Sequence, residues 1–108
     1  MAEPPTVHIE PGHWRIVEAI LRHRVPDAEV WAFGSRARGP TKPYADLDLA
    51  IIASGPLPAA VAANLAEDFS DSDLPWRVDV VDWATTSDAF RAIIERDHVV
   101  LRASVAVS

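Results

Sequence analysis

Cysteine is absent from this chain of 108 residues. Its absence excludes a disulfide framework and any metal site built on thiolates, and it is typical of proteins that work in a reducing compartment. No stretch approaches the roughly 20 consecutive apolar residues that a membrane-spanning helix needs. The amino terminus, MAEPPTVHIEPG, also lacks the basic start and apolar segment of a secretion signal. We therefore expect a cytoplasmic protein with no membrane segment.

Basic residues are few as well. The chain carries 10 Lys and Arg against 16 Asp and Glu, which gives a formal net charge of −6. Because nonspecific binding to a nucleic-acid backbone depends on clustered positive charge, this composition argues against a direct nucleic-acid partner. The 4 histidines show no spacing to acidic residues that would indicate a zinc site.

The length and the 49% hydrophobic content fit one compact domain over residues 1–108, with a loose lead-in over residues 1–11. Helices and strands alternate along it, which predicts an α/β (α+β) fold with a small mixed sheet flanked by helices. Trp31 is expected in the core, and the tail 98–108 is expected to extend the sheet edge or to dock on a partner. Apolar spacing and breaker residues predict helices over Gly12–Arg24 and 57–69 and a third that starts at Thr86 or Ser87, and strands over Glu29–Phe33, Leu47–Ala53 and Arg77–Val81.

Two aspartates, Asp46 and Asp48, stand one residue apart in the sequence YADLDLAII. In an extended strand, alternate side chains share a face, so both carboxylates project from one side while Leu47 and Leu49 project from the other. Two neighbouring anions repel each other unless a cation or a proton compensates. The pair therefore indicates either a site for a hard divalent cation or a solvated strand end.

A glycine-rich turn lies a short way upstream of this pair. Gly34 and Ser35 follow the apolar stretch VWAF, and Arg36 and Arg38 come next in the run GSRARG. Glycine lets the backbone approach an anion closely, and amides, hydroxyl groups and guanidinium groups are suited to phosphate oxygens. We expect these four residues to contact the phosphates of a nucleotide.

Together, the run GSRARGPTKPYADLDLAII resembles the active-site motif of the DNA polymerase beta type nucleotidyltransferase superfamily, in which a Gly-Ser turn precedes Asp-x-Asp in a hydrophobic strand. More closely, it is similar to the minimal nucleotidyltransferase (MNT) domains, which occur as antitoxins paired with HEPN toxins. The resemblance implies a minimal polymerase-beta-like palm and metal ligation by Asp46 and Asp48. Ala45 stands where many relatives have a serine before the first aspartate. This difference bears on the fine positioning of groups at the site and leaves metal binding unaffected.

Members of that superfamily take a third carboxylate from a neighbouring strand. The stretch WRVDVVDW offers two candidates, Asp79 among the apolar residues of a strand predicted to be buried and Asp82 near the strand end, where a helix cap or a turn fits better. By resemblance, the third metal ligand and the acceptor of the hydroxyl proton is Asp79.

The resemblance further implies two Mg²⁺ ions, ATP as donor, and a HEPN-domain toxin as partner. AMP would pass to a hydroxyl of that toxin, a tyrosine by analogy, and silence its RNase activity. Two other functions stay open at this point: an antitoxin that only occludes its toxin, and a nucleotidyltransferase acting on a small molecule. The second is disfavoured because 108 residues leave no room for an acceptor-binding domain.

Overall fold

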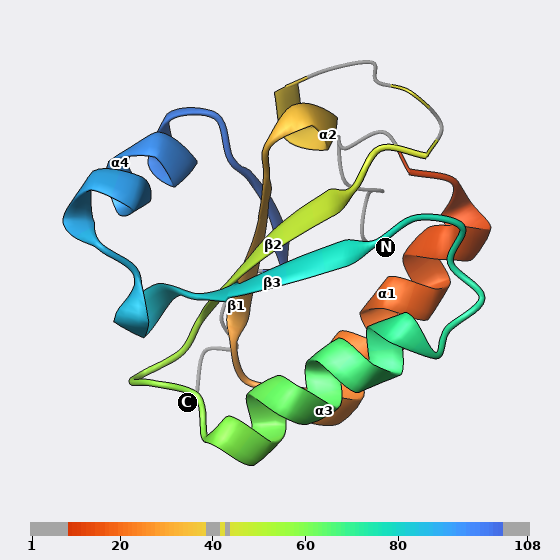
Figure 1. Ribbon diagram of the computed structural model, residues 1–108, viewed down its shortest axis with the longest axis horizontal. Helices are drawn as coiled ribbons and strands as arrows, with labels where there is room; N and C mark the ends of the chain where they lie inside the picture. The colour runs from red at the N-terminus through yellow and green to blue at the C-terminus, as the bar shows by residue number, and fades with distance from the viewer. Residues whose placement is uncertain (1–8, 39–41, 43, 103–108) are drawn as a thin grey trace.

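The computed structural model describes residues 9–38, 42 and 44–102. Within this range, helices and strands alternate as the sequence predicted (Figure 1). The helices are α1 (Pro11–Arg24), α2 (Ser35–Arg38), α3 (Ala59–Ser70) and α4 (Asp88–Arg96), with a 3₁₀ turn, η1 (Trp83–Thr85); the strands are β1 (Glu29–Phe33), β2 (Leu47–Ile52), β3 (Val78–Asp82) and β4 (Val99–Arg102). No described helix is long and apolar enough to cross a bilayer.

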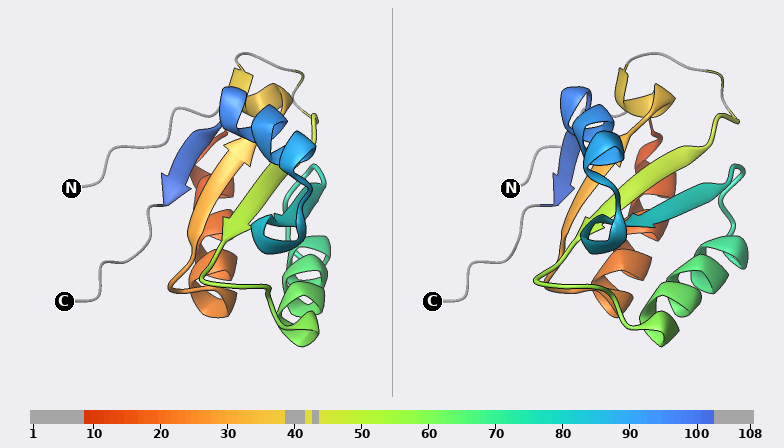
Figure 2. Two further views of the ribbon diagram at one scale, coloured as in Figure 1. Left: turned by 90° about the vertical axis from the view of Figure 1, so that its left-hand side faces the viewer. Right: turned by 60° about the vertical axis from the view of Figure 1, so that its left-hand side comes forward.

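The four strands form a single mixed sheet in the order β3-β2-β1-β4. β1 pairs antiparallel with both β2 and β4, whereas β3 runs parallel to β2. Helices α1 and α3 cover one face of the sheet, and α4 lies on the other (Figure 2). The expected small mixed sheet flanked by helices is confirmed.

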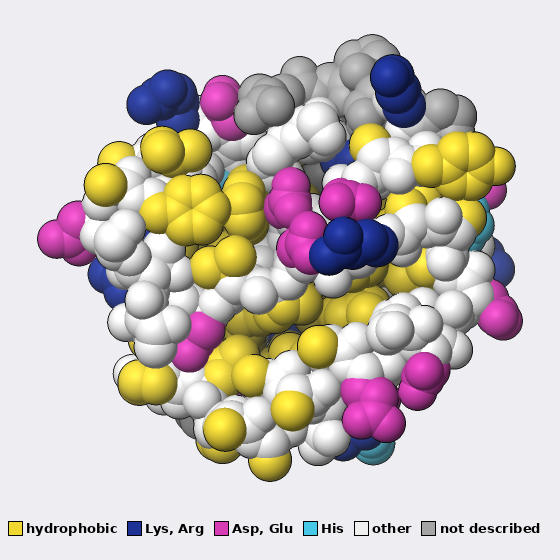
Figure 3. All heavy atoms as spheres, viewed as in Figure 1, with side chains coloured by type: hydrophobic (Ala, Val, Ile, Leu, Met, Phe, Trp, Pro, Cys, Tyr) yellow, Lys and Arg dark blue, Asp and Glu magenta, His cyan; other side chains and the backbone are white. Residues whose placement is uncertain are grey.

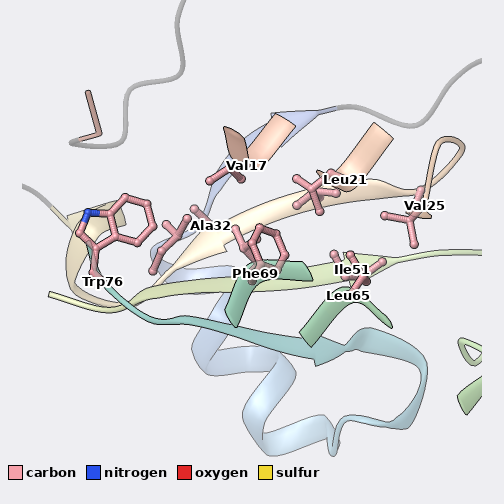
Figure 4. Packing of buried hydrophobic residues seen from close by; sticks show 12 residues of the cluster. Val17, Leu21, Val25, Ala32, Ile51, Leu65, Phe69 and Trp76 are labelled. Carbon is pink, nitrogen blue, oxygen red and sulfur yellow. The ribbon is translucent and has the colours of Figure 1, made fainter. Parts of the chain in front are cut away.

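The main core lies between the sheet and the pair α1 and α3. Leu47, Leu49 and Ile51 alternate along β2 and are fully buried on this face, as the period of a strand requires. Leu21 of α1 and Leu65 of α3 pack against them (Figure 4). Because these leucines fix which way β2 faces, they also direct Asp48 to the opposite face.

Strand β3 differs from its prediction. The sequence suggested a buried strand, yet all its residues are partly exposed. The reason is its place at the edge of the sheet, where it has a neighbouring strand on one side only. Trp31 packs against the smaller core cluster of Phe33, Ala50 and Ile94 on the α4 face, but it is only partly buried there, and its ring stacks on His98 with centroids 3.9 Å apart.

The carboxyl-terminal tail extends the edge of the sheet, which is one of the two arrangements expected for it. Residues 99–102 form β4 and extend the sheet beside β1, while residues 103–108 of the tail lie outside the described part. Residues 1–8 of the expected lead-in also lie outside it, and Ile9 packs against the main core. Of the two proposed caps for the third helix, Ser87 holds the position, because its side chain accepts a hydrogen bond from the Phe90 amide at 3.2 Å.

Candidate active site

The register of β2 and β3 places two of the predicted carboxylates next to each other. Asp48 is the direct partner of Asp79 in this parallel pair. Directly paired residues of neighbouring strands project to the same side, so both side chains lie on the sheet face away from α1 and α3. In that region, Figure 3 shows acidic side chains gathered beside basic atoms.

Asp79 is half exposed rather than enclosed. Its side chain is 47% exposed, and Oδ1 lies 3.5 Å from Nη2 of Arg77, which is itself largely exposed. An exposed ion pair of this kind contributes little stability, typically about 0–1 kcal/mol. The carboxylate is therefore held loosely and stays accessible to a cation or a hydroxyl group.

Asp46 lies just before β2 and is exposed. The backbone here is tied from two sides: Arg36 Nε donates to the Ala45 carbonyl at 2.8 Å, and the Leu47 amide donates to the Arg77 carbonyl at 2.9 Å. These bonds anchor the segment that carries Asp46 to α2 on one side and to the start of β3 on the other.

Gly34 brings the turn after β1 against the Asp48 carboxylate. It has a φ of +77°, a region that favours glycine, and a Cβ placed on it would overlap Asp48 Oδ2 and lie 3.3 Å from Asp48 Cγ. Ser35, the next residue, begins α2 and is partly buried. The glycine-serine turn and the acidic strand, separate in the sequence, thus meet at this point.

The side chain of Arg36 is buried and packs against an aromatic ring. It is 4% exposed, and its guanidinium lies over the Trp76 ring, 4.5 Å from the centroid. Burial lowers the pKa of Arg36, and the negative charge of Asp46 opposes that shift. These contacts let Arg36 position the segment before β2 in addition to the phosphate contact expected for it. The side chain of Arg38, the other expected phosphate contact, lies outside the described residues.

Replacing Arg36 with lysine separates charge from geometry, because lysine keeps the charge but cannot reproduce the planar stacking and the bond from Nε. We expect Arg36→Lys to lower the free energy of unfolding by about 1–3 kcal/mol, through the lost contact and the unsatisfied Ala45 carbonyl. Urea denaturation measures this, with the exposed Arg15→Lys on α1 as control. Unchanged stability would mean that Arg36 contributes through its charge alone.

Asp82, the competing candidate for the third carboxylate, is occupied elsewhere. Its Oδ1 accepts from the Ala84 amide at 3.2 Å, which caps η1, and its Oδ2 accepts from the Leu57 amide at 3.0 Å. It is paired with Ile51, a residue of the main core, and lies three residues beyond Asp79. The cap predicted for Asp82 is confirmed, and Asp79 is the one in register with Asp48.

Among residues 9–38, 42 and 44–102, no three histidine, cysteine, aspartate or glutamate side chains are already gathered as a metal site. The fold supplies the register of Asp48 with Asp79 and places Asp46 just before β2, two residues ahead of Asp48. Metal ligation by these three residues therefore remains a prediction.

Sequence reasoning missed one residue of this site, Trp76. It is buried beneath Arg36 and directly precedes the segment that carries Asp79. The only signal is its place at the start of WRVDVVDW, because nothing local in the sequence pairs it with an arginine in α2.

Comparison with known proteins defines the class. Residues 15–106 match the family model described as nucleotidyltransferase domain. The chain therefore belongs to the nucleotidyltransferase domain family, and the enzyme class predicted from the Gly-Ser and Asp-x-Asp motifs is confirmed.

Within this family, the chain is 58% identical over 87 residues to a protein of Haemophilus influenzae named "Probable protein adenylyltransferase MntA", with 81% of this chain and 76% of that protein covered. Two solved structures share the fold. One is a toxin-antitoxin with AMP-PNP (TM-score 0.71, 24% identity, 84% of this chain and 73% of that chain), and the other is a tri-AMPylated Shewanella oneidensis HEPN toxin in complex with an MNT antitoxin (TM-score 0.69, 22% identity, 89% and 74%).

Proposed function

We propose that this chain is an antitoxin that transfers AMP from ATP, with Mg²⁺, to a tyrosine hydroxyl of a HEPN-domain toxin and thereby neutralises it. The observation that carries the proposal is the register of Asp48 with Asp79 beside the backbone of Gly34. The 58% identical relative named as a protein adenylyltransferase supports AMP as the transferred group, and the complexes of MNT antitoxins with HEPN toxins support the partner.

The residues present fit Mg²⁺. Asp46, Asp48 and Asp79 offer only carboxylate oxygens, which are the hard ligands that this ion prefers. Two of the three are cross-strand neighbours whose mutual repulsion a cation would relieve. Bound Mg²⁺ would supply charge neutralisation of the triphosphate and would make the acceptor hydroxyl more acidic.

The residues of the chain then have separate tasks in the transfer. Gly34 and Ser35 orient the β and γ phosphates, with Arg36 and Arg38 supplying positive charge beside them. The acceptor oxygen attacks the α-phosphorus in line, a new O–P bond forms, and the bond to the bridging oxygen breaks so that pyrophosphate leaves. Asp79, on the β3 side of the site, takes the hydroxyl proton.

The test is to incubate the chain with Mg²⁺, ATP and the HEPN-domain protein encoded by the neighbouring gene. We expect the partner to gain the mass of AMP, and chelation of Mg²⁺ to abolish the gain. Mass spectrometry of the partner measures both. The control is Asp27→Asn: residue 27 lies in the turn before β1, away from the carboxylates, so this variant should behave as the unmodified chain. A partner that is neutralised without any gain in mass would indicate occlusion instead of catalysis.

A further inference from the structure

We propose that Trp76 is a positioning residue of the metal site: its ring supports Arg36, and Arg36 in turn holds the backbone that carries Asp46. This inference rests on the proposed function, in which Asp46 binds Mg²⁺. It assigns a role in metal binding to a buried side chain whose indole offers only an N–H donor and cannot itself ligate the ion.

Trp76 is enclosed by side chains from two helices. It is 8% exposed and lies at one end of the core cluster (Figure 4). The His13 ring of α1 meets it at nearly a right angle, with centroids 5.8 Å apart, and the guanidinium of Arg36 in α2 lies over its face, 4.5 Å from the centroid. Among aromatic side chains, tryptophan attracts a cation most strongly. The indole therefore holds the guanidinium in one place.

Two hydrogen bonds connect this pair to the residues on either side of Asp46. Arg36 Nε donates to the carbonyl of Ala45, the residue before Asp46, at 2.8 Å. The amide of Leu47, the residue after it, donates at 2.9 Å to the carbonyl of Arg77, which directly follows the tryptophan in the chain. One bond thus acts through the indole and the other through the backbone next to it. Asp46 lies between two attachments that lead back to the same place.

Asp46 depends on such support more than Asp48 does. Asp48 lies within β2, where pairing with both neighbouring strands fixes its backbone, whereas Asp46 lies just before the strand and is exposed. A metal ligand has to be held within about 0.5 Å of its productive position, and residues that orient ligands typically contribute about 10–100-fold to metal affinity. Loss of the Trp76 ring should therefore weaken Mg²⁺ binding although all three carboxylates remain.

A second pair of tryptophan and arginine provides the comparison. Arg91 lies over the Trp83 ring, 5.0 Å from the centroid, and its Nε and Nη2 donate to the carbonyl of Trp83 itself at 3.0 and 2.6 Å. These contacts join α4 to η1, whereas the hydrogen bond of the Trp76 pair leads to a residue beside a proposed metal ligand. The two pairs have the same chemistry and differ in what they support.

The test measures how the rise in melting temperature with ATP depends on the concentration of Mg²⁺, which needs no partner protein. Trp76→Met keeps an apolar side chain but removes the ring, and we expect it to raise the Mg²⁺ concentration that gives half of the rise by about tenfold. Trp76→Phe keeps a ring face under Arg36 and should stay within about threefold of the unmodified chain. Trp83→Met, the matched control, should lower the melting temperature without ligand and leave the Mg²⁺ dependence unchanged.

Arg36→Lys tests the route from the indole to Asp46. It keeps Trp76 and β3 but removes the hydrogen bond to the Ala45 carbonyl, so it should raise the Mg²⁺ requirement about as much as Trp76→Met. The two substitutions together should add little to either one alone, because both break the same connection. Arg36→Lys also carries the test if Trp76→Met does not fold.

Each other outcome overturns the assignment. Unchanged Mg²⁺ dependence in folded Trp76→Met, or an equal change in Trp83→Met, means that Trp76 only stabilises the fold. An effect of Trp76→Met without one of Arg36→Lys means that the ring acts through β3. A higher ATP requirement at saturating Mg²⁺ means that it supports the phosphate turn instead.

Failure of this inference can be told apart from failure of the proposed function. If the unmodified chain shows no response to Mg²⁺ with ATP and transfers no AMP to the HEPN-domain protein, both fail together. If it transfers AMP and responds to Mg²⁺, while Trp76→Met has the same Mg²⁺ dependence, the role of Trp76 alone is refuted.

Discussion

Asp48→Asn should lower the rate of AMP transfer by about 1,000-fold or more while the protein stays folded. A metal ligand that stabilises developing charge contributes several kcal/mol to the transition state, and about 4 kcal/mol corresponds to three factors of ten. Asparagine keeps the shape of the side chain but removes the charge. Because Asp48 lies on the partly exposed face of β2, we expect its loss to change the free energy of unfolding by less than about 1 kcal/mol.

The adjacent residue provides the contrasting variant. Leu49 is fully buried on the other face of the same strand, so Leu49→Ala should cost about 2–5 kcal/mol of stability. Urea denaturation and the mass gain of the partner, measured on both variants, separate the two effects. If the Asp48→Asn protein transferred AMP at the normal rate, Asp48 would not be a metal ligand. The neutralisation of the toxin would then need another explanation.

The same alternation explains why the sequence predicted so much of the fold. Strand β2 shows its two faces in the letters LDLAII, because a period of two follows from backbone geometry alone. Strand β1 ended where predicted, at Phe33 before the glycine, and β2 ended one residue earlier than expected. The motif placed Gly34 and Asp48 in one site because β1 and β2 pair antiparallel with Phe33 opposite Asp48, which brings the glycine that follows β1 beside the aspartate.

Other features depend on contacts between distant segments, which local patterns cannot specify. The register of Asp48 with Asp79 arises only when β3 returns after α3 and pairs in parallel with β2. The exposure of β3 follows from its place at the sheet edge, and the stacking of Arg36 on Trp76 follows from the same return of the chain. The apolar composition of β3 correctly predicted a strand but wrongly predicted that the strand is buried. Burial depends on which elements cover a strand, and its own composition does not specify them.

Gly34→Ala tests the meeting of the glycine turn with the acidic strand. A non-glycine residue at a φ of +77° costs about 1–3 kcal/mol, and the new Cβ would displace the Asp48 carboxylate that it overlaps. We expect a drop of that size in the free energy of unfolding. The rate of AMP transfer should fall further, by about 100-fold or more, because a shift of about 1 Å in a catalytic group is enough for such a loss. Gly55→Ala is the matched control, since a Cβ there meets nothing within 4 Å.

A double-mutant cycle with Asp48→Ala resolves the two contributions. Removing the Asp48 carboxylate relieves the overlap but leaves the backbone strain, so Gly34→Ala should cost less stability in that background than in the unmodified chain. Urea denaturation of the four proteins measures the coupling energy between the two positions. A coupling of zero would mean that the cost lies in the backbone alone, and that Asp48 can move aside freely. The Asp48 carboxylate would then reach its position whether or not residue 34 has a side chain. A loss of activity in Gly34→Ala would in that case have to come from the phosphate turn itself.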